Sequence, residues 1–331
     1  MDSFRAFRID EKDGSIVAGF QELTLDDLTE GNVVVRVTHS TINYKDALAA
    51  TGKGRILRRY PLNGGIDFAG VVVSSEDTDF QPGAEVLMNG CGLSETFDGG
   101  YSEYARVDSN GLVPLPEGIS RADAMRIGTA GYTAALAIHR MEQNGQAPEL
   151  GPILVNGATG GVGSMAIDML AGRGYEVVAV TGKAEEEAYL KAIGARRILP
   201  RDEIDFGKRP LEKGEWAGAI DSLGGDHLVW LTRTMNYGGN IASIGLAAGH
   251  ELNTTVMPFI LRAVCLLGIN SVDTPKDLRR AVWRRIGGDL RPQHLDTIGH
   301  RTVSFEELPD MFQAFIDGTV TGRIVVEISG E

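Results

Sequence analysis

The stretch Val155-Asn156-Gly157-Ala158-Thr159-Gly160-Gly161-Val162-Gly163 decides the fold of this chain. It follows a short apolar run, Pro152–Val155, and precedes a segment of helical pattern, Ser164–Gly174. Glycine permits a tight strand-to-helix turn and lets backbone N–H groups approach a pyrophosphate at the positive end of the helix. The stretch therefore predicts a dinucleotide-binding turn with contacts from Thr159, Gly160, Gly161, Val162 and Gly163. Ala158 replaces the usual first glycine, and the alternative interpretation is a turn that binds no ligand.

Strand-like and helical segments alternate on the C-terminal side of this turn. The apolar runs at 176–180, 197–199, 217–221, 240–244 and 265–269 are strand-like, with helical patterns between most of them. Before the turn, Ala122–Met141 is Ala-rich and apolar at helical spacing. Such alternation predicts an α/β fold of the Rossmann type, a doubly wound parallel sheet with helices on both faces.

The first third of the chain and its tail have a different character. Strand-like runs at 32–38, 68–73 and 84–88 are separated by turn residues, and a helical stretch begins near Tyr44. The tail predicts helices near 276–286 and 306–317 and a last strand at 323–328, which has no βα partner and should return to the first domain. Because 331 residues exceed what one core usually supports, we expect two domains, 1–125 with 273–331 and 126–272.

Composition excludes several classes of function. Lysine and arginine total 32 against 45 acidic residues, and the net charge of −13 argues against a nucleic acid as main partner. No apolar run is long enough to cross a membrane, and the charged N-terminal stretch lacks an apolar signal segment. We therefore expect a cytoplasmic protein. Cys91 and Cys265 suggest no disulfide framework, although spacing alone does not exclude a single bridge.

The residues after the second Rossmann strand bear on the choice of dinucleotide. An NAD-binding protein usually has Asp or Glu there to bond the ribose 2′-hydroxyl. Here Thr181, Gly182 and Lys183 follow, and Arg201 comes after the third strand. A hydroxyl, a lysine and an arginine suit a 2′-phosphate, so the sequence favours NADPH over NADH. In the alternative interpretation, Thr181 caps the next helix and Lys183 is a solvated side chain. These roles are compatible with binding of a 2′-phosphate.

Several stretches resemble the medium-chain dehydrogenase/reductase superfamily in order along nearly the whole chain. They are Asn43–Asp46, Gly65–Gly70, Gly99–Tyr104, Gly128–Ala135 and the glycine turn. The chain is similar to the zinc-free quinone oxidoreductase-like branch, and within it to the acryloyl-CoA reductase group, through GTAGYTAALA, NGATGGVGSMA, YLKAIGARRILPRDE and AIDSLGGDHL. The resemblance implies a GroES-like β-barrel domain completed by the C-terminal segment, a Rossmann domain and an active site in the cleft. It also implies a homodimer through an edge strand at Val264–Val272, unless the protein's own loops cover that edge.

The sequence carries none of the metal-binding motifs of the zinc members. The catalytic Cys, the Gly-His-Glu motif and the four-cysteine lobe are missing, and the six histidines are scattered singly. We therefore expect no metal site. NADPH without a metal suits reduction of an activated C=C bond, with hydride added at the β-carbon and the enolate then protonated at the α-carbon.

The resemblance suggests which side chains serve this chemistry. Tyr44 is the candidate proton donor beside the nicotinamide, and the alternative is that it only packs against the cofactor. Asn43 is expected to orient neighbouring groups and Asp46 to cap or brace the loop. By position in the family, Leu246, Ser271 and Arg323 are further expected cofactor contacts, as is Tyr44.

The arginine clusters of the chain bear on the substrate. An acyl-CoA needs cationic side chains for its phosphates, and arginines are dense at 55, 58 and 59 and at 279, 280, 284 and 285. These also suit a solvated surface. The hypothesis is an NADPH-dependent reductase of α,β-unsaturated acyl-CoA, acryloyl-CoA above all. A quinone or alkenal reductase is the first alternative, and an NADPH-binding sensor without catalysis is the second.

Overall fold

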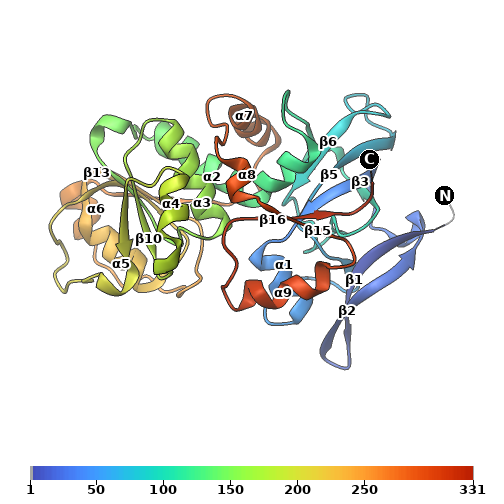
Figure 1. The fold of residues 1–331 in the computed structure, drawn as a ribbon, viewed down its shortest axis with the longest axis horizontal. Helices are drawn as coiled ribbons and strands as arrows, with labels where there is room; N and C mark the ends of the chain where they lie inside the picture. The colour runs from blue at the N-terminus through green and yellow to red at the C-terminus, as the bar shows by residue number, and fades with distance from the viewer. Residues whose placement is uncertain (1–2, 331) are drawn as a thin grey trace. The chain divides into compact units, whose positions relative to one another are not determined.

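The computed structural model describes residues 3–330 and divides into two compact units (Figure 1). The first consists of the residues up to Thr129, Ser271–Gly287 and the residues from Gly299 on; the second consists of Ala130–Asn270 and Gly288–Ile298. The boundaries expected from the sequence lie close to these junctions, but they did not separate 288–298 from the tail.

The second unit is built on a six-stranded parallel sheet. Its order is β11 (Arg197–Pro200), β10 (Val177–Thr181), β9 (Ile153–Val155), β12 (Trp216–Asp221), β13 (Met235–Ser243) and β14 (Cys265–Gly268). Helices α3 (Gly161–Gly172) and α4 (Glu187–Ala192) lie on one side, and α5 (Gly225–Thr234) and α6 (Met257–Arg262) lie on the other (Figure 1). The predicted doubly wound sheet is confirmed, with all six expected strands present.

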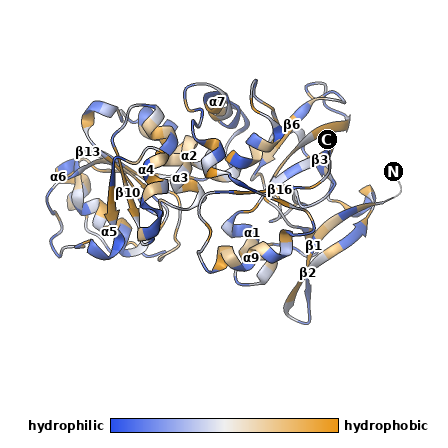
Figure 2. Cartoon of the chain, viewed as in Figure 1, coloured by the Kyte–Doolittle hydropathy of each residue, from blue (hydrophilic) through white to orange (hydrophobic). Residues whose placement is uncertain are grey.

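Burial on both faces explains why the central strands β9, β10 and β12 appear in the sequence as largely apolar runs. All residues of β10 are buried, and Figure 2 shows this strand as hydrophobic. Parallel strands covered by helices have no solvent face and so need no polar alternation. Chain order along the sheet reverses between β9 and β12, and the crevice at the carboxyl ends of such strands is where open α/β sheets bind ligands.

The first unit is β-rich. A three-stranded sheet joins β2 (Ser15–Leu23), β1 (Phe4–Lys12) and β4 (Leu62–Asn63). A second sheet joins β15 (Arg301–Ser304), β16 (Ile324–Glu327), β3 (Val33–Thr41), β5 (Asp67–Ser75), β6 (Glu85–Asn89) and β8 (Val113–Pro114), and β7 (Tyr104–Val107) also pairs with β3. The prediction that the last strand returns to this domain is confirmed, because β16 pairs antiparallel with β3.

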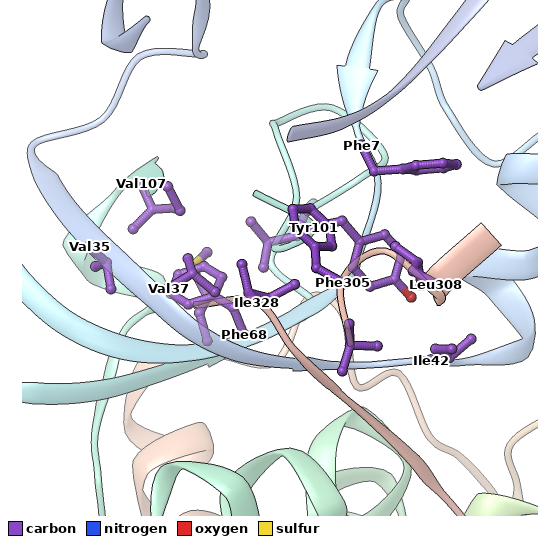
Figure 3. Close-up of a cluster of buried hydrophobic side chains, with 14 of the residues drawn as sticks. Phe7, Val35, Val37, Ile42, Phe68, Tyr101, Val107, Phe305, Leu308 and Ile328 are labelled. Atoms are coloured by element: carbon purple, nitrogen blue, oxygen red, sulfur yellow. The ribbon is translucent and has the colours of Figure 1, made fainter. Parts of the chain in front are cut away.

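The core of the first unit is aromatic and aliphatic (Figure 3). Phe7, Tyr101 and Phe312 contact one another with ring centroids 5.6–6.5 Å apart. Each such pair adds about 0.5–1.5 kcal/mol beyond its area burial. This core holds helix α1 (Tyr44–Thr51) against α9 (Leu308–Ile316), so it fixes the segment that carries the candidate catalytic residues.

Three further α-helices lie in the part of the chain that the structure describes. Helix α7 (Lys276–Gly287) belongs to the first unit and α8 (Leu295–Ile298) to the second. Helix α2 (Arg121–Gln143) agrees with the expected Ala-rich helix, but its backbone is non-helical at Gly128, where φ is 51°.

Candidate functional site

The glycine turn begins where β9 ends. Gly157 has a φ of 58°, in the region that favours glycine, and Gly160 is the N-cap of α3. The N–H of Ala158 donates to the carbonyl of Val180 over 3.3 Å, which ties the turn to β10. A Cβ at Gly163 would lie 2.3 Å from the carbonyl oxygen of Gly157. The glycine at 163 therefore lets the first turn of α3 press directly against the loop.

This geometry fits a dinucleotide pyrophosphate. The first backbone N–H groups of a helix have no acceptor inside the helix, and the N-cap Gly160 supplies no side-chain acceptor. Gly160 is exposed, and Gly161 and Val162 are half-buried, so the donors at this end are open to an anion. Backbone donors and the helix dipole together favour a phosphate at such a terminus.

A buried polar pair behind the turn was not anticipated from the sequence. The side-chain amide of Asn156 donates to Asp221 over 2.5 Å, and its oxygen accepts from the N–H of Ser222 over 2.7 Å. Asp221 also accepts from the N–H of Gly224 over 3.1 Å, and burial raises the pKa of its carboxyl. The pair links the ends of β9 and β12. The feature of the sequence that could have predicted this pair is the position of Asn156 and Asp221 at the ends of two strand-like runs.

The region after β10 brings the proposed 2′-phosphate residues together. Thr181 pairs with Pro200 across β10 and β11, so Gly182 lies level with Arg201. The Arg201 guanidinium lies against Gly182, since a Cβ there would be 2.6 Å from Nη2. The Thr181 hydroxyl accepts from the N–H of Lys183 over 2.9 Å and does not cap the following short helix, whose N-cap is Lys183. The exposed Arg201 therefore lies beside the end of β10, the position at which NAD-binding proteins usually have Asp or Glu.

Leu246 and Ser271, two other expected cofactor contacts, do not belong to the loops after β10 and β11. Leu246 follows β13 and is 66% exposed. Ser271 belongs to the first unit, and its carbonyl accepts from Arg279 over 3.3 Å. Their contacts with a cofactor stay predictions.

A buried cluster of charged and polar side chains lies at the start of α1. Asn43 is the N-cap, and the N–H and side-chain amide of Asn43 donate to Asp46 over 2.9 and 3.0 Å. The other oxygen of Asp46 accepts from the N–H of Ile66 over 3.0 Å. Asp46 is 2% exposed. It therefore caps the helix and braces the neighbouring loop, as its place in the sequence suggested.

Arg323 and Asp67 are the charged centre of this cluster. Arg323 is 3% exposed and donates to the Thr41 hydroxyl over 2.8 Å and to the Asn43 side-chain oxygen over 3.1 Å. Its guanidinium lies 4.0 Å from Asp67, which is fully buried and accepts from Asn43 and from the N–H and hydroxyl of Thr129. The Arg323 donors are thus occupied within the protein, and a direct contact with a cofactor stays a prediction.

Packing against this cluster explains the kink at Gly128. A Cβ there would lie 2.6 Å from the Arg323 guanidinium and 2.9 Å from an Asp67 oxygen. Only glycine combines that clearance with a positive φ. The Gly128-Thr129 pair, part of a motif that carried the resemblance, therefore closes the charged cluster.

Burial perturbs the acids of the cluster. Burial and the nearby Asp67 charge raise the pKa of Asp46 to about 7, against the hydrogen bonds from Asn43 and Ile66. Burial also raises the pKa of Asp67, although Arg323 opposes the rise. The pKa of Tyr101 is raised well above its usual value by burial and by both carboxylates. Such perturbed groups are typical of functional sites, and also of structural ion networks.

Tyr44 is the exposed member of this region. It is the first residue of α1 and is 51% exposed, while its neighbours Asn43 and Asp46 are buried. The capping network fixes the backbone of Tyr44, so its ring is presented from a rigid base.

The two arginine clusters differ in their environment. Arg279 is 1% exposed and donates to the carbonyls of Asn89 and Val272, and Arg280 lies 3.8 Å from Asp79. The Arg279 and Arg280 side chains therefore contact groups of the protein itself, whereas Arg284 is exposed. A phosphate-binding role of this cluster stays a prediction. Arg55 and Arg58 are exposed beside a pocket.

Within residues 3–330, no group of three or more His, Cys, Asp or Glu side chains is placed to hold a metal ion. Among the same residues, no helix is both long and apolar enough to span a membrane. The expected cytoplasmic location stays a prediction.

Two protein-family descriptions match the chain: "Alcohol dehydrogenase GroES-like domain" over residues 29–117 and "Zinc-binding dehydrogenase" over residues 161–286. The probable acrylyl-CoA reductase AcuI of Escherichia coli is 47% identical over 98% of this chain and 100% of its own length. The putative quinone oxidoreductase YhfP of Bacillus subtilis is 46% identical, over 98% of this chain and 99% of its own length.

Solved structures of similar proteins contain nicotinamide dinucleotides. The YhdH oxidoreductase of Salmonella enterica, solved with NADP, matches with a TM-score of 0.95 and 46% identity over 98% of this chain and 100% of that one. The YhfP protein of Bacillus subtilis, solved with NAD, matches with a TM-score of 0.96 and 46% identity over 99% of this chain and 100% of that one.

Proposed function

Because the chain belongs to the acrylyl-CoA reductase and quinone oxidoreductase-like branch of the medium-chain dehydrogenase/reductase superfamily, we propose that it reduces an α,β-unsaturated acyl-CoA with NADPH. Acryloyl-CoA is the first candidate, with propionyl-CoA as product. The observation that carries the cofactor choice is the exposed Arg201 guanidinium against Gly182, at the end of a strand that no carboxylate follows.

The chain's own residues supply positioning and a proton donor. Bound NADPH provides a hydride for the β-carbon of the substrate. The glycine turn holds the pyrophosphate, while Thr181, Lys183 and Arg201 bind the 2′-phosphate. The thioester carbonyl delocalises the charge that develops on the substrate, and the resulting enolate takes a proton at its α-carbon. Tyr44 is the proposed donor of that proton, directly or through an ordered water.

Replacing Tyr44 with phenylalanine tests this role. We expect kcat for acryloyl-CoA to fall about a hundredfold, a typical value for the loss of a positioned general acid. The KM for NADPH should change little, because the ring remains. Steady-state kinetics of Tyr44→Phe and Tyr44→Ala separate the two interpretations: if Phe retains full kcat and only Ala loses it, Tyr44 packs against the cofactor and is not the donor.

The proposed reaction is tested by substrate comparison. NADPH oxidation is followed with acryloyl-CoA, crotonyl-CoA, acrolein and a benzoquinone, and acryloyl-CoA should give the highest kcat/KM. The quinone alternative has a specific support, the 46% identity to the relative named putative quinone oxidoreductase. Turnover of quinone without turnover of either thioester would favour that alternative, and tight NADPH binding without any turnover would favour the sensor.

We also infer that two copies associate through the second unit. β14 is the edge strand of the sheet, and apolar side chains are exposed on it and on α6. They are Val256, Met257, Ile260, Leu261 and Leu266, between 37% and 71% exposed. An apolar patch at an unpaired strand edge is a typical site of two-fold pairing.

A charge in this patch should dissociate the dimer. Ile260 is 71% exposed, so Ile260→Asp should leave the folded subunit intact while placing a carboxylate in the interface. Analytical ultracentrifugation should show a dimer for the wild-type protein and a monomer for this variant. Leu150→Asp, at an apolar residue that is 53% exposed outside the patch, is the matched control and should stay dimeric. A monomeric wild-type protein would contradict the inference.

A further inference from the structure

A pocket of about 380 Å³ in the first unit has a cationic lining. Lys45, Arg55, Ile56, Leu57, Arg58 and Glu95 surround it. Three of these side chains are cationic and only Glu95 is anionic, so the lining carries a surplus of positive charge. The chain as a whole has a net charge of −13, so this pocket differs in sign from the protein's overall charge and attracts anions locally.

Glu95 is the single carboxylate among the lining residues, and it pairs with two of the three cations. Glu95 lies 2.6 Å from the Lys45 ammonium and 4.0 Å from the Arg58 guanidinium, and its side chain is 12% exposed. Within the described residues 3–330, no carboxylate lies within ion-pair distance of Arg55. The guanidinium groups of Arg55 and Arg58 therefore keep N–H donors available to a ligand. The planar arrangement of these donors matches the oxygens of a phosphate.

The backbone of the pocket is held in place on two sides. The N–H of Arg58 donates to the carbonyl of Glu95 over 2.7 Å, and the N–H of Gly54 donates to the carbonyl of Leu48 in α1 over 3.2 Å. Leu57 is 2% exposed and anchors the loop in the core. The cations thus stand on a rigid base, which reduces the entropy lost when a ligand binds.

The pocket also adjoins the candidate catalytic residue in the chain. Lys45 directly follows Tyr44 in the first turn of α1. A substrate whose reactive end lies at Tyr44 and whose other end carries phosphates would find cations beside this turn. We propose that Lys45, Arg55 and Arg58 bind the phosphate groups of the acyl-CoA substrate, an inference that rests on the proposed function.

The test compares two thioesters that differ in their phosphates. Arg55→Ala and Arg58→Ala should each raise the KM for acryloyl-CoA about tenfold, since each removes a charge-assisted hydrogen bond. The KM for acryloyl-N-acetylcysteamine, which has no phosphate, should change less than about twofold in the same variants. Lys53→Ala is the matched control, because Lys53 is an exposed cation of the same loop outside the pocket lining.

Adenosine 3′,5′-bisphosphate and inorganic phosphate distinguish the sources of the anion. The bisphosphate should compete with acryloyl-CoA in the wild-type protein and lose most of this effect in Arg58→Ala, while inorganic phosphate at the same concentration should compete weakly. Equal competition by both anions would point to a general anion site and overturn the proposal.

Other outcomes separate this proposal from the proposed function. If the wild-type protein reduces acryloyl-CoA but the pocket variants keep its KM, or Lys53→Ala raises it equally, the pocket proposal is wrong and the function stands. The pocket proposal is also wrong if the variants impair both thioesters equally. If the wild-type protein reduces neither thioester, the proposed function is wrong, and so is the pocket proposal that rests on it.

Discussion

Arg323→Met should lower the free energy of unfolding by about 3–5 kcal/mol, the usual cost of leaving a buried charge without its partner. Arg323 is 3% exposed, and its removal strands Asp67, which is fully buried, beside a second buried carboxyl, Asp46. Both acids would have to remain protonated or take in water. Urea unfolding followed by tryptophan fluorescence measures the change.

Two variants show whether charge is the cause. Arg5→Met removes an arginine whose partner Glu306 is 64% exposed, and should cost about 1 kcal/mol or less, as surface pairs do. Adding Asp67→Asn to Arg323→Met removes the stranded charge while keeping an amide of similar shape, so the double variant should regain part of the lost stability. A double variant no more stable than Arg323→Met would contradict the electrostatic explanation and point to lost hydrogen bonds.

Removing Lys183 and Arg201 should change the coenzyme preference of the enzyme. In the double alanine variant we expect the KM for NADPH to rise about a hundredfold, because each charge-assisted phosphate contact is worth about a factor of ten. The KM for NADH should change less than about threefold, since NADH has no 2′-phosphate for these cations to bind. Steady-state kinetics with both coenzymes and one saturating thioester give the two ratios.

Lys191→Ala is the control for this change. Lys191 lies on α4, next along the chain, and pairs with Glu187 over 2.5 Å in an exposed i,i+4 pair. Its loss removes one positive charge from the same region without touching the end of β10. A similar rise of both KM values in the Lys183 and Arg201 variant would contradict the 2′-phosphate assignment. The NAD-bound structure of the Bacillus subtilis relative makes this comparison necessary.

Local pattern was sufficient to predict the sheet of the second unit, although not the membership of residues 288–298 in that unit. Its central strands β9, β10 and β12 are buried on both faces, so they appear in the sequence as largely apolar runs such as Val177–Val180. The glycine turn was predictable for the same reason, since the requirements of its backbone act within nine consecutive residues, Val155 to Gly163. The position of Arg201 beside Gly182 was predictable because Arg201 follows a strand directly and that strand pairs parallel with β10.

The first unit was predicted less completely, because its site depends on contacts between distant segments. β1 and β2 pair over nine residues each, but several of their side chains are charged and half-exposed, which hides the strand pattern. Arg323 was expected to face a cofactor, and nothing local shows that it meets Thr41 and Asn43, more than 270 residues earlier. Gly128 appeared in a recognised motif, but the reason for a glycine there emerges only when Asp67 and Arg323 are seen beside it.

We propose that this chain transfers hydride from NADPH to the β-carbon of an unsaturated acyl-CoA. The most direct test is to incubate the enzyme with acryloyl-CoA and NADPH deuterated at C4 of the nicotinamide, using each stereoisomer in turn, and to locate deuterium in the product. We expect propionyl-CoA with one deuterium at C3 from one of the two stereoisomers, and an α-hydrogen that comes from solvent. Absence of propionyl-CoA, or deuterium at the α-carbon, would contradict it.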